Sequence, residues 1–588
     1  MTHIRSCLRS SLSYSQTVAL VAVFCLLGAA GCEDNTATLR KIQQQKQARM
    51  EATSKVDHLR DTYLLFGQLG ESNLEAAAAQ VRYHLNAWQE SQAARSDSGP
   101  DSLAIPESLV ATWDDALVTA TVKDRMESEL FLESDVEHFR LQYLLHRISD
   151  WALDGASLDP WLQERLDAES LDETESYDLG IACQYFDWVI RNVQLEPQVL
   201  GGPAPAAPRL SAGLQFRGPG YRQTSWETLW RGSGDAWQRS DLFLQLCRQA
   251  GLDACLLAVP QGPEENLQPW LTAVRIGDQL YLFDAELGLA VPGPDEKGIA
   301  TLAEAQQDPT ILRRLRVPGL FEYPFTSQQI QNCVALLDAN PELLSNRMKR
   351  LEEGFTGDRR MSLSLDAAGV AERIGALDGI SAVQLWQVPL QAMLYQQGIA
   401  EAMRDDLALN QWYYLQWGIF DRQSQLYPAR WHHLEGLFDD DPEANIKGAR
   451  VQYMKLRSPE FELEDLNMDI QLQMEYGLRR AAGEAEADHR RRVLVVQEVM
   501  RAVKRTATFW IALMHVEEGR WETAEKWLKG RVLEDPQAGR WYPSARYNLG
   551  RVSERLGDLE QAEAMYKTNG YPQEQGNRIR ARSLDDEE

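Results

Sequence analysis

The sequence predicts a mainly α-helical chain with one small α+β region, and three observations lead to this class. Apolar residues recur at helical spacing through most of the chain. One stretch, residues 235–284, combines a helical pattern with short apolar strands. Near the carboxyl end a helical motif returns after 38 residues, a period typical of stacked helix pairs. A chain of 588 residues is long enough for several domains with cores of ordinary size.

The amino terminus has the pattern of an export signal. Arg5 and Arg9 precede an apolar segment, Val18–Leu27, which is too short for a comfortable membrane span. Small residues fill positions 28–31, directly before Cys32. This order of basic, apolar and small residues ahead of a cysteine resembles a bacterial lipoprotein signal.

The resemblance implies that residues 1–31 are removed and that Cys32 is acylated, with residues 32–37 as a short tether. More than one acyl chain would hold the protein stably at a membrane of the cell envelope. The position three before the cysteine, usually leucine in this family of signals, is Ala29 here. An ordinary secretory signal cleaved near Gly31 and an uncleaved anchor are the alternatives, and both also lead out of the cytoplasm.

Residues 38–171 form the next predicted region, which is helical. Thr38–Gln68 is rich in Lys, Arg and Gln with irregularly spaced apolar residues, which indicates a solvated helix or a loose coiled coil. Ser96–Pro106 contains a Gly-Pro step and predicts a linker. Glu107–Leu171 is helical and acidic again. Its core candidates are Trp113, Leu117, Phe131, Phe139, Tyr143 and Leu144.

A helix and three strands are predicted between residues 235 and 284. The helix covers 235–250, because its apolar residues form one stripe. Ala254–Val259 is a short apolar run between turn residues, which suits a strand buried on both faces. Trp270–Ile276 and Gln279–Asp284 alternate as strands of a hairpin, with Gly277-Asp278 as a two-residue turn.

The segment Gly234–Ala254 resembles the nucleophile helix of transglutaminase-like domains, which belong to the papain-like superfamily. The likeness lies in the leucine-rich end of the helix and in the Arg-x-x-Gly pattern of Arg248 and Gly251. The resemblance implies a transglutaminase-like domain over residues 175–298, built from a helix and antiparallel strands.

The resemblance also implies where a catalytic triad would lie. The family's nucleophilic cysteine corresponds to Ala236, its histidine to Gln268 and its aspartate to Asp284. A methyl group and a carboxamide cannot replace a thiolate and an imidazole. We therefore expect an inactive domain without catalytic residues, in which these positions converge with Trp237 and Trp270 in a cleft for an extended peptide. Asp284 alone could equally cap a turn at the end of a strand.

A relocated site is the alternative hypothesis: a cysteine acyl-transfer enzyme or peptidase that uses Cys183, or a histidine such as His432 or His433 from elsewhere in the chain. Against it, Cys183, Cys247, Cys255 and Cys333 have apolar neighbours and are predicted to be core residues. Adjacent histidines on a helix point about 100° apart and would not bind one metal ion. No zinc, redox or nucleotide motif is present, so we expect no metal and no cofactor.

Residues 299–503 are predicted to be a second helical region, and residues 505–568 a pair of repeats. The repeats resemble tetratricopeptide repeats (TPR), in which small residues allow two antiparallel helices to approach closely. Residues 569–588 have little hydrophobic content and are expected to form a flexible tail. The residues that carry the repeat are Ala512, Gly519, Ala524 and Leu528, matched by Gly550, Gly557, Ala562 and Tyr566.

The charge balance limits the partners. The chain has 87 acidic and 60 basic residues and a formal charge of −27, which would repel phosphates and argues against nucleic-acid binding. We therefore expect a lipid-anchored, non-catalytic protein that binds or organises proteins or peptides in the cell envelope. A third hypothesis places the binding function in the repeats alone and leaves the middle of the chain merely structural.

Overall fold

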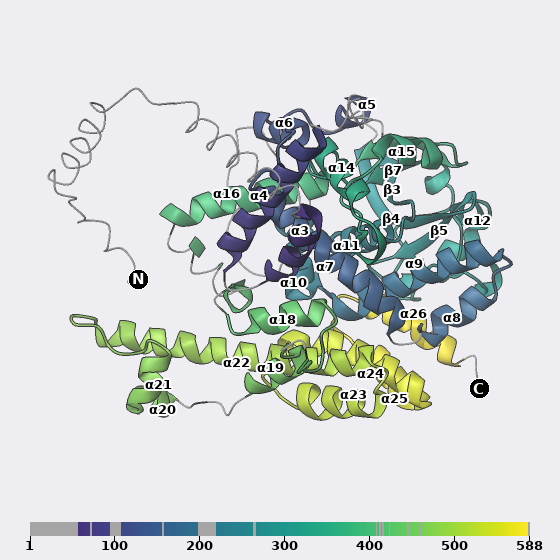
Figure 1. Ribbon diagram of the computed structural model, residues 1–588. Helices are drawn as coiled ribbons and strands as arrows, with labels where there is room; N and C mark the ends of the chain where they lie inside the picture. The colour runs from purple at the N-terminus through teal and green to yellow at the C-terminus, as the bar shows by residue number, and fades with distance from the viewer. Residues whose placement is uncertain are drawn as a thin grey trace, which may run out of the picture. The chain divides into compact units, whose positions relative to one another are not determined.

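The computed structural model describes residues 57–585 apart from 71–72, 94–106, 156–157, 198–218, 263–265, 407–408, 411–412, 414–416, 423, 444–445, 458–460 and 462 (Figure 1). The predicted signal, Cys32, the tether and the linker Ser96–Pro106 lie outside the described residues. The chain divides into two compact units, Met1–Arg60 and Asp61–Glu588. All described strands and nearly all described helices belong to the second unit.

A mixed six-stranded sheet lies in the second unit, with the strand order β6-β5-β4-β3-β7-β8. Neighbouring strands are antiparallel except for β7 and β8, which are parallel. A separate small sheet pairs β1 with β2 in parallel. The strands are β1 (Gln194–Leu195), β2 (Ser233–Gly234), β3 (Ala254–Gln261), β4 (Asn266–Ile276), β5 (Gln279–Asp284), β6 (Leu289–Ala290), β7 (Cys333–Leu337) and β8 (Ile380–Leu385).

The predicted strand and hairpin are confirmed by β3, β4 and β5. β3 has neighbours on both sides and is apolar at almost every position, as a strand covered on both faces requires. The hairpin closes at the pair Ile276↔Gln279. Gly277 has φ +56°, a conformation that costs glycine little and explains why the turn lies here.

The predicted helix of residues 235–250 is confirmed as α11 (Ala236–Gln249). The carboxylate of Asp235 accepts a hydrogen bond from the N–H of Gln238 at 3.0 Å, and the Gln238 side chain accepts from the N–H of Asp235 at 2.9 Å. This reciprocal capping fixes where the helix begins. Gly251, with φ +76°, ends it.

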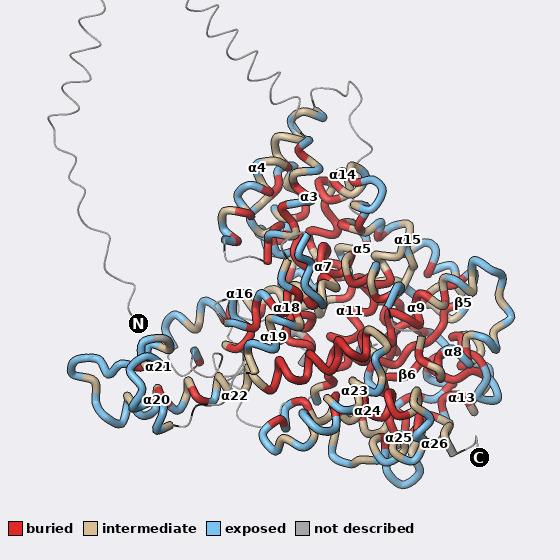
Figure 2. Tube along the Cα trace, turned by 60° about the horizontal axis from the view of Figure 1, so that its bottom comes forward, coloured by how far each residue is buried: buried red, intermediate tan, exposed pale blue. Residues whose placement is uncertain are grey.

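One face of the sheet packs against α11 and α9 (Glu173–Asn192). Phe243 of α11, Phe186 of α9 and Phe283 of β5 form a triangle of rings with centroids 5.2 to 5.3 Å apart. Further along α11, Leu244 packs in a buried cluster with Leu256 of β3 and its neighbours on β7. Buried residues gather along α7, α9 and α11 and in the second half of α22 (Figure 2).

Helices dominate residues 299–503, as predicted, but β7 and β8 also lie in that range and extend the sheet beyond residue 298. β7 is a run of five buried residues, Cys333–Leu337, paired on both sides. A short apolar run of this kind has no periodicity that separates a strand from a helix. Cys333 is nevertheless buried, as predicted.

Helices make up most of the described chain. Those before the sheet are α3 (His58–Gln68), α4 (Leu74–Ala93), α5 (Glu107–Val110), α6 (Ala120–Glu127), α7 (Asp135–Asp154), α8 (Pro160–Asp167) and α10 (Ser225–Arg231). Those after β5 and before the repeats are α12 (Leu302–Gln307), α13 (Pro309–Arg314), α14 (Asn346–Gly354), α15 (Ala367–Gly375), α16 (Gln387–Asp405), α18 (Leu426–Leu434), α19 (Ala449–Lys455), α20 (Leu463–Met468) and α21 (Ile470–Glu475).

The repeated motif forms two helical hairpins, each turned by a glycine with positive φ: Gly519 and Gly557. Gly550 allows the second pair of helices to approach closely, because a Cβ there would lie 2.5 Å from the ring of Tyr566. The first hairpin pairs α22 (Glu486–Glu517) with α23 (Trp521–Trp527) and a π-helical turn (Leu528–Leu533), and the second pairs α24 (Tyr542–Leu556) with α25 (Leu559–Tyr566).

The expectation of a flexible tail over residues 569–588 is wrong. This segment forms α26 (Glu574–Asp585), and Arg580 on it is 2 % exposed. Arg580 donates two hydrogen bonds of 2.7 Å to the carboxylate of Asp159 and pairs with Glu554 of α24. Buried ion pairs, which hydrophobic content does not reveal, hold this helix in place.

Replacing Gly550 by alanine should destabilise the protein by about 1–3 kcal/mol, the usual cost of inserting a methyl group into a tightly packed site. Chemical unfolding of the purified chain measures this free energy. The matched control is G530A, where the nearest atom to an added Cβ is 3.9 Å away, and its stability should stay close to the wild-type value. Equal free energies of unfolding for G550A and the wild type would show that the two helices can separate enough to accept the methyl group.

Candidate functional site

The position of the family's nucleophile is occupied by Ala236, the first residue of α11. Ala236 is buried, and its methyl group can neither attack nor titrate. The capping box of Asp235 and Gln238 takes up N–H groups of the first turn, which would otherwise face a ligand. Burial raises the pKa of Asp235 to about 6. Side chains of the helix itself therefore use the hydrogen-bonding groups at its start.

Asp284 lies at the end of β5 and is held by three donors. One carboxylate oxygen accepts from the N–H of Glu286 at 3.0 Å and of Leu287 at 2.9 Å. The other accepts from the hydroxyl of Tyr323 at 2.8 Å, and Trp270 donates to that hydroxyl at 2.9 Å. Burial raises the pKa of Asp284. These contacts agree with a residue that caps a turn, and a phenol rather than an imidazole approaches it.

Gln268 is exposed and does not reach the helix start. A bulge after the pair Leu256↔Thr272 shifts the register of β3 and β4 by one residue, so Gln268 pairs with Val259. Side chains alternate along a strand, and Leu267 packs on the cluster that faces α11. Gln268 therefore points to the opposite face, contrary to the expectation of a shared cleft.

The two tryptophans expected in that cleft have different neighbours. Trp237 packs beside the buried cluster that contains Leu244 and Trp386. Trp270 lies against Phe325, with ring centroids 5.9 Å apart, and donates to Tyr323. Trp270 is thus linked to Asp284 by hydrogen bonds through the hydroxyl of Tyr323. Trp237 instead packs against the apolar cluster and is not part of this chain of hydrogen bonds.

The four cysteines of the described chain are all buried, as predicted: Cys183, Cys247, Cys255 and Cys333. Burial raises the pKa of each thiol, for Cys333 to about 12. None of the four donates a hydrogen bond to a histidine or accepts one from it within the described residues. A thiol held in this way stays protonated at neutral pH and is a poor nucleophile.

The two adjacent histidines are engaged on the α18 side of the molecule. A ring nitrogen of His432 lies 2.8 Å from the carbonyl oxygen of Lys447. His433 is buried, with a ring nitrogen 3.2 Å from the guanidinium of Arg430. Burial, followed by this positive neighbour, lowers the pKa of His433 well below its usual range, so it is neutral at neutral pH.

A cavity of about 420 Å³ flanks the first half of α11, and we call it the α11 pocket. Its wall combines side chains from α7, α10, α11 and α16 with the segment that follows β7. The volume lies in the range of small-molecule sites. Its apolar wall includes Leu141, Trp226, Trp237, Trp386, Val388, Pro389, Ala392 and Met393. Its polar lining includes Arg125, Glu137, His138, Gln223, Glu227, Asp241, Gln245, Asp338 and Glu342.

Asp241 is the central polar residue of the α11 pocket. It is 6 % exposed, accepts from the hydroxyl of Ser225, and accepts from Gln245 at 3.1 Å. Burial, followed by the neighbouring Asp338, raises the pKa of Asp241 well above its usual range. Asp338 itself is paired with Arg248 at 2.7 Å. Asp241 is therefore held by neutral donors and by the carboxyl of Asp338, and no arginine or lysine of the described chain pairs with it directly.

Glu227 of α10 lines the same pocket. Its carboxylate accepts from the N–H of Thr224 at 2.8 Å and from the hydroxyl of Tyr413 at 3.3 Å. Burial raises the pKa of Glu227 to about 7. Raised carboxyl pKa values that gather in a cavity are typical of functional sites.

His138 of α7 also lines the pocket, and no sequence signal pointed to it, because α7 lies about 100 positions before α11. Its Nε2 lies 2.9 Å from the carbonyl oxygen of Leu363. A carbonyl only accepts, so Nε2 carries the proton. Burial lowers the pKa of His138 to about 4, so the ring is neutral at neutral pH.

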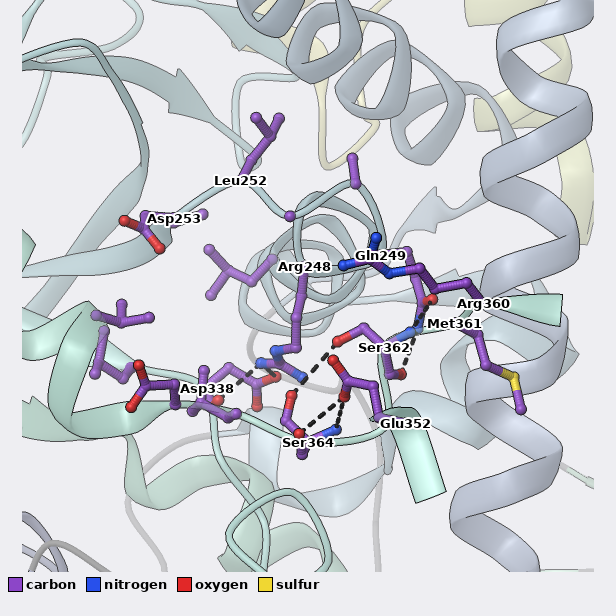
Figure 3. Close-up of a pocket in the computed structure, with 18 residues that line it drawn as sticks. Arg248, Gln249, Leu252, Asp253, Asp338, Glu352, Arg360, Met361, Ser362 and Ser364 are labelled. Carbon is purple, nitrogen blue, oxygen red and sulfur yellow. Dashed lines mark hydrogen bonds and ion pairs between the residues drawn. The ribbon is translucent and has the colours of Figure 1, made fainter. Parts of the chain in front are cut away.

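A second hollow, of about 460 Å³, lies at the other end of α11 (Figure 3). Its polar groups satisfy one another: Gln249 and Ser362 exchange two hydrogen bonds of 2.9 and 3.0 Å. Glu352 accepts from the N–H and the hydroxyl of Ser364 at 2.8 Å, and Arg248 pairs with Asp338. This hollow is a hydrogen-bonded support for the chain, whereas the α11 pocket retains carboxyls without cations.

The described part of the chain contains no group of three or more His, Cys, Asp or Glu side chains that could hold a metal ion. None of its helices is long and apolar enough to cross a membrane.

Comparison with known proteins gives no relative: no family model, no curated protein and no solved structure matches the chain.

The E227Q variant should gain stability over the wild type as the pH rises from about 5 to 7.5. In the unfolded chain Glu227 ionises near its ordinary pKa of 4.5, whereas in the folded chain it ionises near 7. The wild type therefore loses folding free energy across this window, and glutamine does not. Thermal unfolding at a series of pH values checks this. A constant difference between the two proteins at all pH values would contradict it.

Proposed function

We propose that the mature chain is a lipid-anchored, non-catalytic binding protein of the cell envelope, built on an inactive transglutaminase-like domain with TPR-like repeats. The observation that carries the proposal is the start of α11, where Ala236 and a closed capping box occupy the place of a nucleophile. The order of helix, strand and hairpin from α11 to β5 supports the likeness to the family.

The chemistry of the remaining groups supports the absence of catalysis. The described thiols are buried and carry raised pKa values, and the hydroxyl beside Asp284 belongs to Tyr323. Acyl transfer through a covalent intermediate needs a nucleophile and a base within hydrogen-bond distance. Among the described residues around α11 no thiol is paired with an imidazole in this way, whereas the cavity beside the helix could bind a ligand.

The contacts of the repeats favour binding at α11 over binding by the repeats alone. Gln573, next to α26, accepts a hydrogen bond of 2.7 Å from Arg239 of α11, and Arg551 of α24 pairs with Asp187 of α9 at 2.7 Å. Asn548 of α24 donates to the carbonyl of Arg191 at 3.2 Å. One side of the hairpins thus packs against α9 and α11, the helices beside the sheet. That side of the repeats is therefore occupied by contacts within the chain.

A thiol-directed activity probe should leave all four described cysteines unlabelled in the native protein and label them after unfolding. The reason is that each thiol is buried and protonated at neutral pH. Mass spectrometry of the probe-treated chain locates any label. Rapid native labelling of one cysteine, together with amide-directed acyl transfer that its alanine variant loses, would refute the non-catalytic proposal and favour the relocated site.

Replacing Cys32 by alanine should abolish acylation and release the protein from the membrane fraction. Metabolic labelling with a fatty acid and fractionation of the cells measure both effects. The matched control is C25A, in the apolar part of the signal, which should be acylated and retained like the wild type. Fatty-acid labelling of C32A at the wild-type level would rule out this anchor.

A further inference from the structure

We infer that the α11 pocket binds a guanidinium group, such as the side chain of an arginine residue on a partner peptide or protein. The inference rests on the proposed binding role, because recognition of a partner residue needs no turnover. The groups that would receive the guanidinium are the carboxyls of Asp241 and Glu227, with the indole rings of Trp237 and Trp386 in the wall.

The carboxyls that line the pocket differ in whether an arginine of this chain pairs with them. Three of the five acidic residues that line it have an arginine of this chain as partner: Glu342 with Arg125 at 2.6 Å, Asp338 with Arg248 at 2.7 Å and Glu137 with Arg140 at 2.9 Å. The other two, Asp241 and Glu227, have no arginine or lysine within hydrogen-bond distance in the described chain. Asp241 contacts Ser225, Gln245 and the carboxyl of Asp338, and Glu227 contacts Thr224 and Tyr413.

The rest of the molecule shows which cation such sites take. Buried Asp135 receives two hydrogen bonds, of 2.6 and 2.8 Å, from the guanidinium of Arg347. The buried carboxylates Asp135, Asp159 and Asp187 all pair with arginine. The lysine pairs Lys349–Glu353 and Lys567–Glu563, in contrast, lie on exposed or half-exposed helix surfaces. A planar guanidinium is weakly hydrated and binds carboxylates through two parallel bonds, so burial costs it less than an ammonium.

The aromatic wall fits the same group. Elsewhere in the chain guanidinium carbons lie over indole rings, with Arg430 4.3 Å from the ring centre of Trp510 and Arg165 3.5 Å from that of Trp161. A cation over an indole face is stabilised by the charge distribution of the ring. Three indoles line the α11 pocket, and the guanidinium of Arg140 lies over one of them, Trp226, at 4.0 Å. The other two lie with two carboxyls that have no arginine partner in a cavity of about 420 Å³, large enough for one such side chain.

The test compares capped arginine with capped citrulline, N-acetyl and methylamide derivatives of equal shape, in calorimetric titrations of residues 32–588. Citrulline replaces the guanidinium by a neutral urea, so it should bind at least about ten-fold more weakly. Capped lysine is the third probe and should also bind more weakly than arginine, because its ammonium cannot form two parallel bonds. Free arginine, added as a competitor, distinguishes a small-molecule ligand from a peptide residue.

The variant D241N keeps the shape of the side chain and its neutral partners while it removes the charge. It should lose the preference for arginine over citrulline. The matched control is D278N, at the exposed turn between β4 and β5, which should keep the wild-type preference. Circular dichroism confirms that both variants are folded. The arginine–citrulline comparison on the wild-type chain decides the question even if D241N fails to fold.

Equal binding of arginine and citrulline, or no binding of either, would overturn the inference and leave the non-catalytic proposal intact. Equal binding of arginine and lysine would overturn the choice of guanidinium. Catalysis is tested separately by the thiol probe, so a failure of that proposal is distinguishable from a failure of this one. A preference for peptide-borne arginine over free arginine supports a protein partner, and the reverse preference supports a small guanidinium compound.

Discussion

A network of buried arginine–carboxylate pairs joins α8 and α9 to the helices at the other end of the chain. Arg580 binds Asp159 through two bonds of 2.7 Å, and Arg551 links Asp159 to Asp187 at 3.1 and 2.7 Å. Arg191 then connects Asp187 to α22. A buried charge that loses its partner is strongly destabilising. The early helices and the carboxyl-terminal hairpins therefore have to fold together, and neither end is an independent module.

The carboxyls around α11 are held differently, and this contrast locates the candidate site. Asp235, Asp241 and Asp284 are all buried, accept hydrogen bonds from neutral groups, and have raised pKa values. Asp235 caps the helix and Asp284 caps a turn, so each has a structural task. Asp241 caps neither a helix nor a turn, since it contacts the side chains of Ser225, Gln245 and Asp338. In the inferred binding mode, this buried carboxyl is the group that a guanidinium would meet.

Local signals predicted the elements of the α+β region, and distant contacts explain what the sequence could not predict. The cap at Asp235 and the turn at Gly277 lie within a few residues of the elements they fix. α26, by contrast, is held by Arg580 and a carboxylate 421 positions earlier. His138 enters the α11 pocket from a helix with no sequence link to it. A bulge of one residue in β4 was enough to turn Gln268 away from the expected cleft.

Charge connects the proposed anchor with the proposed ligand. A formal charge of −27 attracts guanidinium groups over distances of about one Debye length, roughly 10 Å in dilute salt, and a recessed carboxyl such as Asp241 then fixes them at short range. The same charge repels anionic lipid head groups, so electrostatic adsorption cannot hold this protein at a membrane. In the proposed function, acyl chains on Cys32 supply the attachment instead. An acidic surface held near a membrane in this way stays free for basic partners, because the lipid does not compete for it.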